Sequence, residues 1–226
     1  MPTTTKTLMF LSGFLTSLGA SAVICSVLGT QEWVTSTVGI RDSVSDGNVI
    51  ITYGLSRGES IQQLNLGLEE PTKYFEVLGV LNNSSQKALH VVTILFLALS
   101  LCASLLSCGF TFYNSVSNPY QTFLGPVGVY TWNGLSASFV FVAMMLFVGN
   151  TQSHHLSEEL SRLLYPTVTT TSSTHSYGHS FWLILLVILL NVATVVIIIF
   201  YQKARYQRRQ EQKKPLEFAP RDGILF

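Results

Sequence analysis

Four long apolar segments alternate with polar stretches along the chain. A helix rises about 1.5 Å per residue, so about 20 residues cross a hydrocarbon core of roughly 30 Å. Backbone polar groups in lipid must be satisfied within the segment, which makes such spans helical. The pattern therefore predicts four transmembrane helices, since the segments contain no Asp, Glu, Lys or Arg and run from Leu8 to Leu28, Leu89 to Phe110, Leu124 to Val148 and Phe181 to Tyr201.

The first segment has a second interpretation, because Lys6 precedes it and Ala20-Ser21-Ala22 has the small-x-small pattern of a signal-peptidase site. Cleavage there would leave three spans. The apolar run continues through Leu28, beyond the roughly 7 to 15 residues of a signal core, which favours an uncleaved first span.

The polar stretch after the first span has the pattern of a small folded cap. Residues 33–40 and 49–55 are rich in β-forming types, and Asp46-Gly47 between them is a turn signal, so we expect a β-hairpin. Tyr74, Val77, Leu78 and Leu81 recur at the spacing of one face of a short helix.

The polar stretch before the last span divides into two parts. Residues 154–164 place Leu156, Leu160, Leu163 and Leu164 on one side of a short amphipathic helix that Pro166 ends. The Thr/Ser run from Thr167 to Ser176 reads as a flexible tether that could carry O-linked sugar.

The distribution of charge sets the expected orientation. Only 11% of residues are charged, and seven of the thirteen Lys and Arg residues follow the last span. Because cytoplasmic flanks carry the positive excess, we expect both termini to be cytoplasmic. The stretch 29–88 has seven acidic and four basic residues, a net charge of −3, which fits an outer placement. The expected boundaries are an N-terminus at 1–7, spans at 8–28, 89–110, 124–149 and 181–201, outer loops at 29–88 and 150–180, and cytoplasmic segments at 111–123 and 202–226.

Small and polar residues in the spans are candidates for helix packing, because small side chains let helices approach closely and amides hydrogen-bond across them. These residues are Gly13, Ser17, Ser21, Ser100, Ser104, Asn133 and Asn191. No predicted span contains Asp, Glu, Lys or Arg. A proton relay, a voltage sensor or an ion-coupled transporter would therefore lack its usual charged side chains.

Motifs for chemistry are scarce. The sequence has no phosphate-binding glycine loop, Gly-x-Ser-x-Gly elbow or His-Glu-x-x-His, so we expect a protein without enzymatic activity or cofactor. His175 and His179 have metal-ligand spacing, but their Ser/Thr/Gly context disfavours a helix, and we expect no metal site. All three cysteines lie in predicted spans, so the first outer loop has no disulfide.

Three surface features are candidates for modification or binding. Asn82 and Asn83 open overlapping glycosylation sequons. The last residues include Ile224 and Phe226, an apolar pattern resembling a PDZ ligand. A basic cluster that could face anionic lipid follows the last span and consists of Lys203, Arg205, Arg208, Arg209, Lys213 and Lys214.

Several stretches carry a resemblance to known families. Trp33 and the later Gly54-Leu55 resemble the claudin-like signature, although Ser56 replaces its second Trp and both of its cysteines are missing. The closer resemblance is to the clarins, through Gly29 to Trp33, Tyr53 to Glu59, Asn118 to Gly128 and His154 to Glu158. The expected fold is thus an all-α, claudin-like four-helix membrane bundle with a small extracellular β-hairpin/α cap in the first loop, in which Trp33, Gly54 and Leu55 pack.

The resemblance implies a non-enzymatic, multi-pass protein of the plasma membrane. Its family is associated with sensory-cell membranes, including sensory perception of sound, and with links to actin. The leading hypothesis is a membrane organiser or adaptor that binds membrane lipid and other membrane proteins, with a PDZ or cytoskeletal partner at the tail and no nucleic acid. The alternative is an auxiliary subunit of an ion channel or a claudin-like junction or barrier component.

Overall fold

The computed structural model describes residues 3–41, 46–64, 71–82, 84–116, 125–167 and 169–217. Four long helices form a bundle: α1 (Thr3–Gly29), α3 (Ser84–Val116), α4 (Gly125–Gln152) and α6 (His179–Glu217). Within the described residues, these four are long and apolar enough to cross a membrane, as the sequence predicts. Helix α3 packs against α1 and α4, and α6 packs against the same two helices from the other side.

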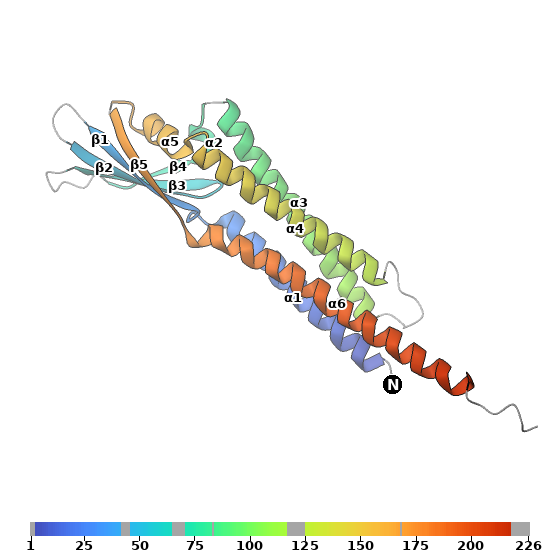
Figure 1. Cartoon of the computed structure of the whole chain (residues 1–226). Helices are drawn as coiled ribbons and strands as arrows, with labels where there is room; N and C mark the ends of the chain where they lie inside the picture. The colour runs from blue at the N-terminus through green and yellow to red at the C-terminus, as the bar shows by residue number, and fades with distance from the viewer. Residues whose placement is uncertain are drawn as a thin grey trace, which may run out of the picture.

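A β-sheet caps one end of the bundle (Figure 1). Its strands are β1 (Val34–Arg41), β2 (Asp46–Tyr53), β3 (Arg57–Leu64), β4 (Lys73–Glu76) and β5 (Thr169–Tyr177), in the order β4-β3-β2-β1-β5. All four pairings are antiparallel. Two short helices, α2 (Val77–Val80) and α5 (Leu156–Leu164), complete the cap.

The predicted hairpin exists, but it is one part of a larger sheet than the sequence predicts. Strands β1 and β2 pair with Arg41 opposite Asp46, so Asp46 and Gly47 belong to β2, and the connection lies at residues 42–45, outside the described residues. Buried and exposed side chains alternate along β1, and Val34, Val38 and Ile40 are buried on the inner face. This alternation fits a strand with one face against the core. The cap is therefore a five-stranded sheet rather than a hairpin alone.

Two expectations for the cap are wrong. Residues 169–177 form strand β5 instead of a flexible tether, because their backbone pairs along the whole of β1. Tyr74 and Phe75 lie in β4, and only Val77 to Val80 form a single helical turn, because the backbone of β4 pairs with β3 and exposes 75% of Tyr74. The helix predicted in the second outer loop is confirmed as α5, with Leu156 and Leu160 buried.

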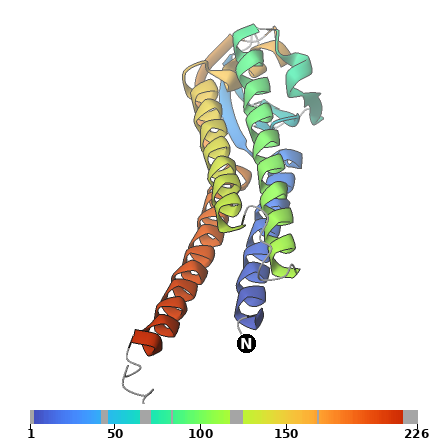
Figure 2. The same ribbon diagram turned by 90° about the vertical axis from the view of Figure 1, so that its right-hand side faces the viewer.

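One hydrophobic core joins the cap to the bundle. It includes Trp33, Tyr53 and Leu55 from the cap, together with Phe147 of α4 and Phe181 of α6. Figure 1 shows that α6 continues past the ends of the other long helices on the side opposite the cap, and Figure 2 shows the same bundle from the side. The molecule thus presents a β-sheet cap at one end and a protruding helix at the other.

Candidate functional site

Hydroxyl groups connect α1 to α3 inside the bundle. Ser17 Oγ lies 3.2 Å from Ser107 Oγ, and Ser21 Oγ lies 2.9 Å from Ser104 Oγ. All four residues are buried. The serine pairs let the two helices approach closely while each hydroxyl keeps a partner.

The buried amides of Asn133 and Asn191 extend this polar seam to α4 and α6. The Nδ2 group of Asn133 donates to Ser107 Oγ at 2.6 Å, and that of Asn191 donates to Ser136 Oγ at 3.3 Å. Ser100 Oγ in α3 donates to the carbonyl of Ser136 at 3.0 Å. The sequence-predicted packing residues therefore lie at helix contacts that link all four helices.

Gly13 and Thr16 are further contact points of α1 with its neighbours. A Cβ at Gly13 would lie 3.6 Å from Ile198 of α6 and 3.6 Å from Thr111 of α3, so the glycine sits where three helices meet. Thr16 Oγ1 lies 2.7 Å from Thr194 Oγ1 of α6. The sequence singled out Gly13, but it gave no signal for the partners Ser107, Ser136 and Thr194.

A second set of contacts fixes the cap to the bundle. The indole N–H of Trp33 donates to the carbonyl of Val27 at the end of α1 at 2.9 Å, and its ring centroid lies 4.7 Å from that of Phe147. The imidazole Nε2 of His90 in α3 lies 2.7 Å from the carbonyl oxygen of Leu55. Trp33 and Leu55 share the core cluster, and these contacts attach the start of the sheet and the β2–β3 turn to three spans.

Gly54 in the β2–β3 turn allows a close approach between the cap and α1. A Cβ at this position would lie 2.2 Å from the carbonyl oxygen of Thr30, nearer than side-chain atoms approach. Only glycine lets this turn rest against the residue that follows α1.

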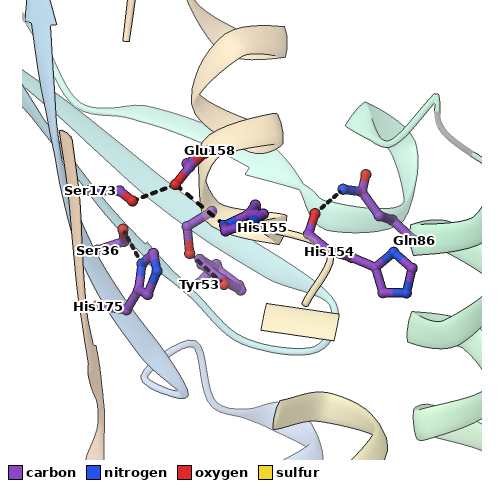
Figure 3. Close-up of polar contacts among 9 residues, drawn as sticks. Ser36, Tyr53, Gln86, His154, His155, Glu158, Ser173 and His175 are labelled. Carbon is purple, nitrogen blue, oxygen red and sulfur yellow. Dashed lines mark hydrogen bonds and ion pairs between the residues drawn. The ribbon is translucent and has the colours of Figure 1, made fainter. Parts of the chain in front are cut away.

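Helix α5 is attached to the sheet by side chains that Figure 3 shows. Tyr53 Oη lies 2.8 Å from Ser157 Oγ, and Ser173 of β5 donates to Glu158 Oε1 at 2.5 Å. Glu158 also lies 3.5 Å from His155 Nδ1. Burial raises the pKa of Tyr53 to about 12, because a buried phenolate would lose its hydration.

The histidines of the cap lie apart and have different partners. His175 Nδ1 lies 3.2 Å from Ser36 Oγ under α5, whereas His179 Nδ1 pairs with Glu32 Oε2 at 2.6 Å beside the start of α6. The carbonyl of His154 accepts a hydrogen bond from Gln86 (Figure 3). Within the part of the chain that the structure describes, no three His, Cys, Asp or Glu side chains gather where a metal could bind.

The remaining predicted positions lie at the surface or outside the described residues. Asn82 is exposed between α2 and α3. Lys203, Arg205, Arg208 and Arg209 are exposed on the protruding part of α6, and Lys213 and Lys214 continue that helix. Asn83, Ile224 and Phe226 lie outside the described residues.

Comparison with known proteins points to one family. A family model described as Clarin-2, Clarin-2-like, matches residues 5–199. The human protein Clarin-3 is 74% identical over 226 residues, which cover 100% of both chains, and Clarin-3 of Mus musculus is 69% identical over the same length and coverage. Human Clarin-1 is 28% identical over 194 residues, covering 81% of this chain and 83% of the relative. The similarity to clarin-3 proteins therefore extends over the cap, the bundle and the tail.

Proposed function

The chain belongs to the clarin family, and we propose that it acts as a non-enzymatic membrane organiser that holds other membrane proteins beside a defined lipid and cytoskeletal environment. Four candidate spans and the family make it a multi-pass membrane protein. We propose that the protein lies in the plasma membrane, with both termini in the cytoplasm and the cap outside the cell. The positive tail supports that orientation.

The observation that carries the proposal is the attachment of an exposed sheet to the bundle by buried contacts. The face of the sheet turned away from α5 exposes polar residues from four strands: Thr37, Asn48, Gln63 and Thr174. Trp33, Leu55 and Tyr53 tie the same sheet to the spans and to α5. A polar sheet face that buried contacts attach to the ends of the spans is suited to binding a partner protein.

The protruding part of α6 supports a second contact on the cytoplasmic side. Lys203, Arg205, Arg208 and Arg209 are exposed there. Each cation near an anionic leaflet contributes about 1 kcal/mol of attraction. We propose that this basic helix meets anionic lipid and a cytoskeletal or PDZ partner, and that the family's association with sensory cells and actin extends to this member.

The alternative of an auxiliary channel subunit has a candidate contact face on α4. On α4, Thr131, Gly134 and Ser138 are exposed on one side of the helix, and a Cβ at Gly134 would meet nothing within 4 Å. Such a small-residue face accommodates a helix of another membrane protein. The auxiliary role and the organiser role then differ only in the partner.

The proposal is tested by identifying what accompanies the endogenous protein. Proximity labelling and co-purification in mild detergent should recover the same membrane proteins. A variant with Lys203, Arg205, Arg208 and Arg209 changed to Gln should lose the cytoplasmic partners, whereas Lys87→Gln in the cap region serves as a charge control. A monomer without reproducible partners in native tissue would refute the organiser role, and a recovered channel whose currents change would favour the alternative.

A further inference from the structure

A polar groove opens where the cap meets the end of α1. Its first part has a volume of about 350 Å³ and is lined by Gln31, Arg57, Gly58, Tyr74, Phe75 and Glu76. An adjoining part of about 450 Å³ shares Gln31, Arg57 and Glu76 and adds Gly29, Ser56 and Leu78. Both volumes lie in the range of roughly 300 to 1,000 Å³ that small-molecule sites occupy.

The groove lies at the level where a span leaves the membrane. Gly29 is the last residue of the first candidate span, and it lines the groove together with Leu78 of α2. Figure 2 shows the segment of β4 and α2 overhanging the cap end of α1. A molecule in the groove would therefore stand beside α1 at the boundary between hydrocarbon and water.

The groove presents one cation and one anion that are not engaged with each other. Arg57 and Glu76 lie opposite one another in the register of β3 and β4, and both are exposed. In the part of the chain that the structure describes, neither side chain takes part in an ion pair within 4.0 Å. The site thus offers one subsite for an anion and one for a cation. The two subsites lie on neighbouring strands, whose backbones are about 5 Å apart.

Two aromatic residues, Tyr74 and Phe75, also line the groove. A Cβ at Gly58 would lie 2.6 Å from the ring of Phe75, so this glycine leaves room for the ring beside the groove. Tyr74 lines the wall and is 75% exposed. An aromatic face within reach of a carboxylate is the arrangement that binds quaternary ammonium groups.

We propose that the groove binds the zwitterionic headgroup of a membrane phospholipid, with the phosphate at Arg57 and the choline or ethanolamine cation at Glu76 and Tyr74. An anion alone would meet the carboxylate of Glu76, and a cation alone would meet the guanidinium of Arg57. A ligand carrying both charges satisfies both groups, and guanidinium fits phosphate particularly well. The position beside α1 favours a lipid over a free solute, and the proposal stands whether or not the protein is an organiser.

The test uses the purified full-length protein and native mass spectrometry after exchange into phosphatidylcholine or phosphatidylglycerol. The wild-type protein should retain phosphatidylcholine at least about fivefold more than phosphatidylglycerol, since loss of one charge-assisted contact changes affinity about tenfold. Arg57→Gln should lower retention of phosphatidylcholine by a similar factor. Glu76→Gln should abolish the preference while leaving phosphatidylglycerol bound.

Matched controls are Arg162→Gln and Glu159→Gln, which change the same types of charge on α5 away from the groove. Both should retain the wild-type preference. Equal retention of the two lipids by the wild-type protein would overturn the proposal, as would an unchanged preference in both groove variants. Free phosphocholine that displaces the lipid at equal concentration would overturn the assignment to a membrane lipid. The preference for phosphatidylcholine over phosphatidylglycerol is measured on the wild-type protein. The proposal can therefore be tested even if a variant fails to fold.

Discussion

Replacing Trp33 with alanine should detach the cap from the bundle. The indole is fully buried, its ring packs against Phe147, and its N–H donates to the carbonyl of Val27. Truncating a buried Trp costs about 3 to 5 kcal/mol, and a lost hydrogen bond adds about 1 kcal/mol. The Val27 carbonyl also accepts a hydrogen bond from Thr30 Oγ1, so it keeps one partner and the total should stay near 4 kcal/mol.

The assay is thermal unfolding of the detergent-purified protein, together with surface level in cells. In a protein of this size about 1 kcal/mol shifts Tm by roughly 2 to 4 °C, so Trp33→Ala should lower Tm by about 10 °C. Trp33→Phe keeps a ring but loses the donor, and it should lose about 1 to 2 kcal/mol. Trp182, whose side chain is 57% exposed, supplies the control Trp182→Ala. If Trp33→Ala and Trp182→Ala unfold at the same temperature, Trp33 does not hold the cap in place.

Three further predictions concern the buried Tyr53, the glycines 54 and 134, and the cysteines. The pKa of Tyr53 is raised from 10.0 to about 12, so the folded state holds the phenolic proton more tightly than the unfolded state, and up to about 3 kcal/mol of stability should be lost as pH rises from 10 towards 12. Tyr53→Phe should flatten that part of a plot of Tm against pH, and an unchanged slope would contradict the burial of Tyr53. Gly54→Ala should lower surface expression because its Cβ would meet the Thr30 carbonyl at 2.2 Å, whereas Gly134→Ala, which meets nothing within 4 Å, should not. Mild reduction should leave surface protein unchanged, because all three cysteines are free; loss of the protein on reduction, measured by surface labelling, would disprove this.

The parts of the fold that the sequence predicts are those with a strong local physical signal. A span must bury about 20 apolar residues in lipid, so its composition alone reveals it. The first hairpin is evident from its two runs of β-forming residues, and α5 from its leucines at helical spacing. These elements exist in the structure, although helix α6 (His179–Glu217) runs well past the predicted end of the last span at residue 201.

Strand β5 could not be predicted because its signal is not local. Its inward residues Ser173, His175 and Tyr177 are only partly buried and show no apolar alternation. The strand forms because the edge of β1 supplies its backbone partners, with Val34 opposite Tyr177. The Thr/Ser run therefore has the pattern of a flexible tether, and only its pairing with β1 shows that it is a strand.

In the candidate site, the sequence likewise predicts the packing residues but not the residues that they contact. The small and amide residues of the spans are visible in the sequence, since few other reasons place Asn133 or Asn191 in lipid. Their partners Ser107 and Ser136 could not be chosen among the many serines, because helix order and rotation are not encoded in spacing. The groove at Arg57 and Glu76 was likewise invisible, because it depends on the pairing of β3 with β4.

The pairing of β5 with β1 also explains how the cap folds without a disulfide. The two strands join the chain leaving α1 to the chain entering α6, and the links themselves are hydrogen-bonded: Gly178 N–H donates to the Trp33 carbonyl at 2.8 Å, and Ser180 N–H donates to that of Glu32 at 3.2 Å. A Cβ at Gly178 would lie 2.3 Å from the Glu32 oxygen, so this contact requires glycine. Because α1 and α6 already pack together in the bundle, the ends of the two outer segments start close in space and the entropy cost of pairing them falls. A disulfide restricts an unfolded chain in a similar way, so the membrane spans here supply the constraint that cysteines provide in small secreted domains.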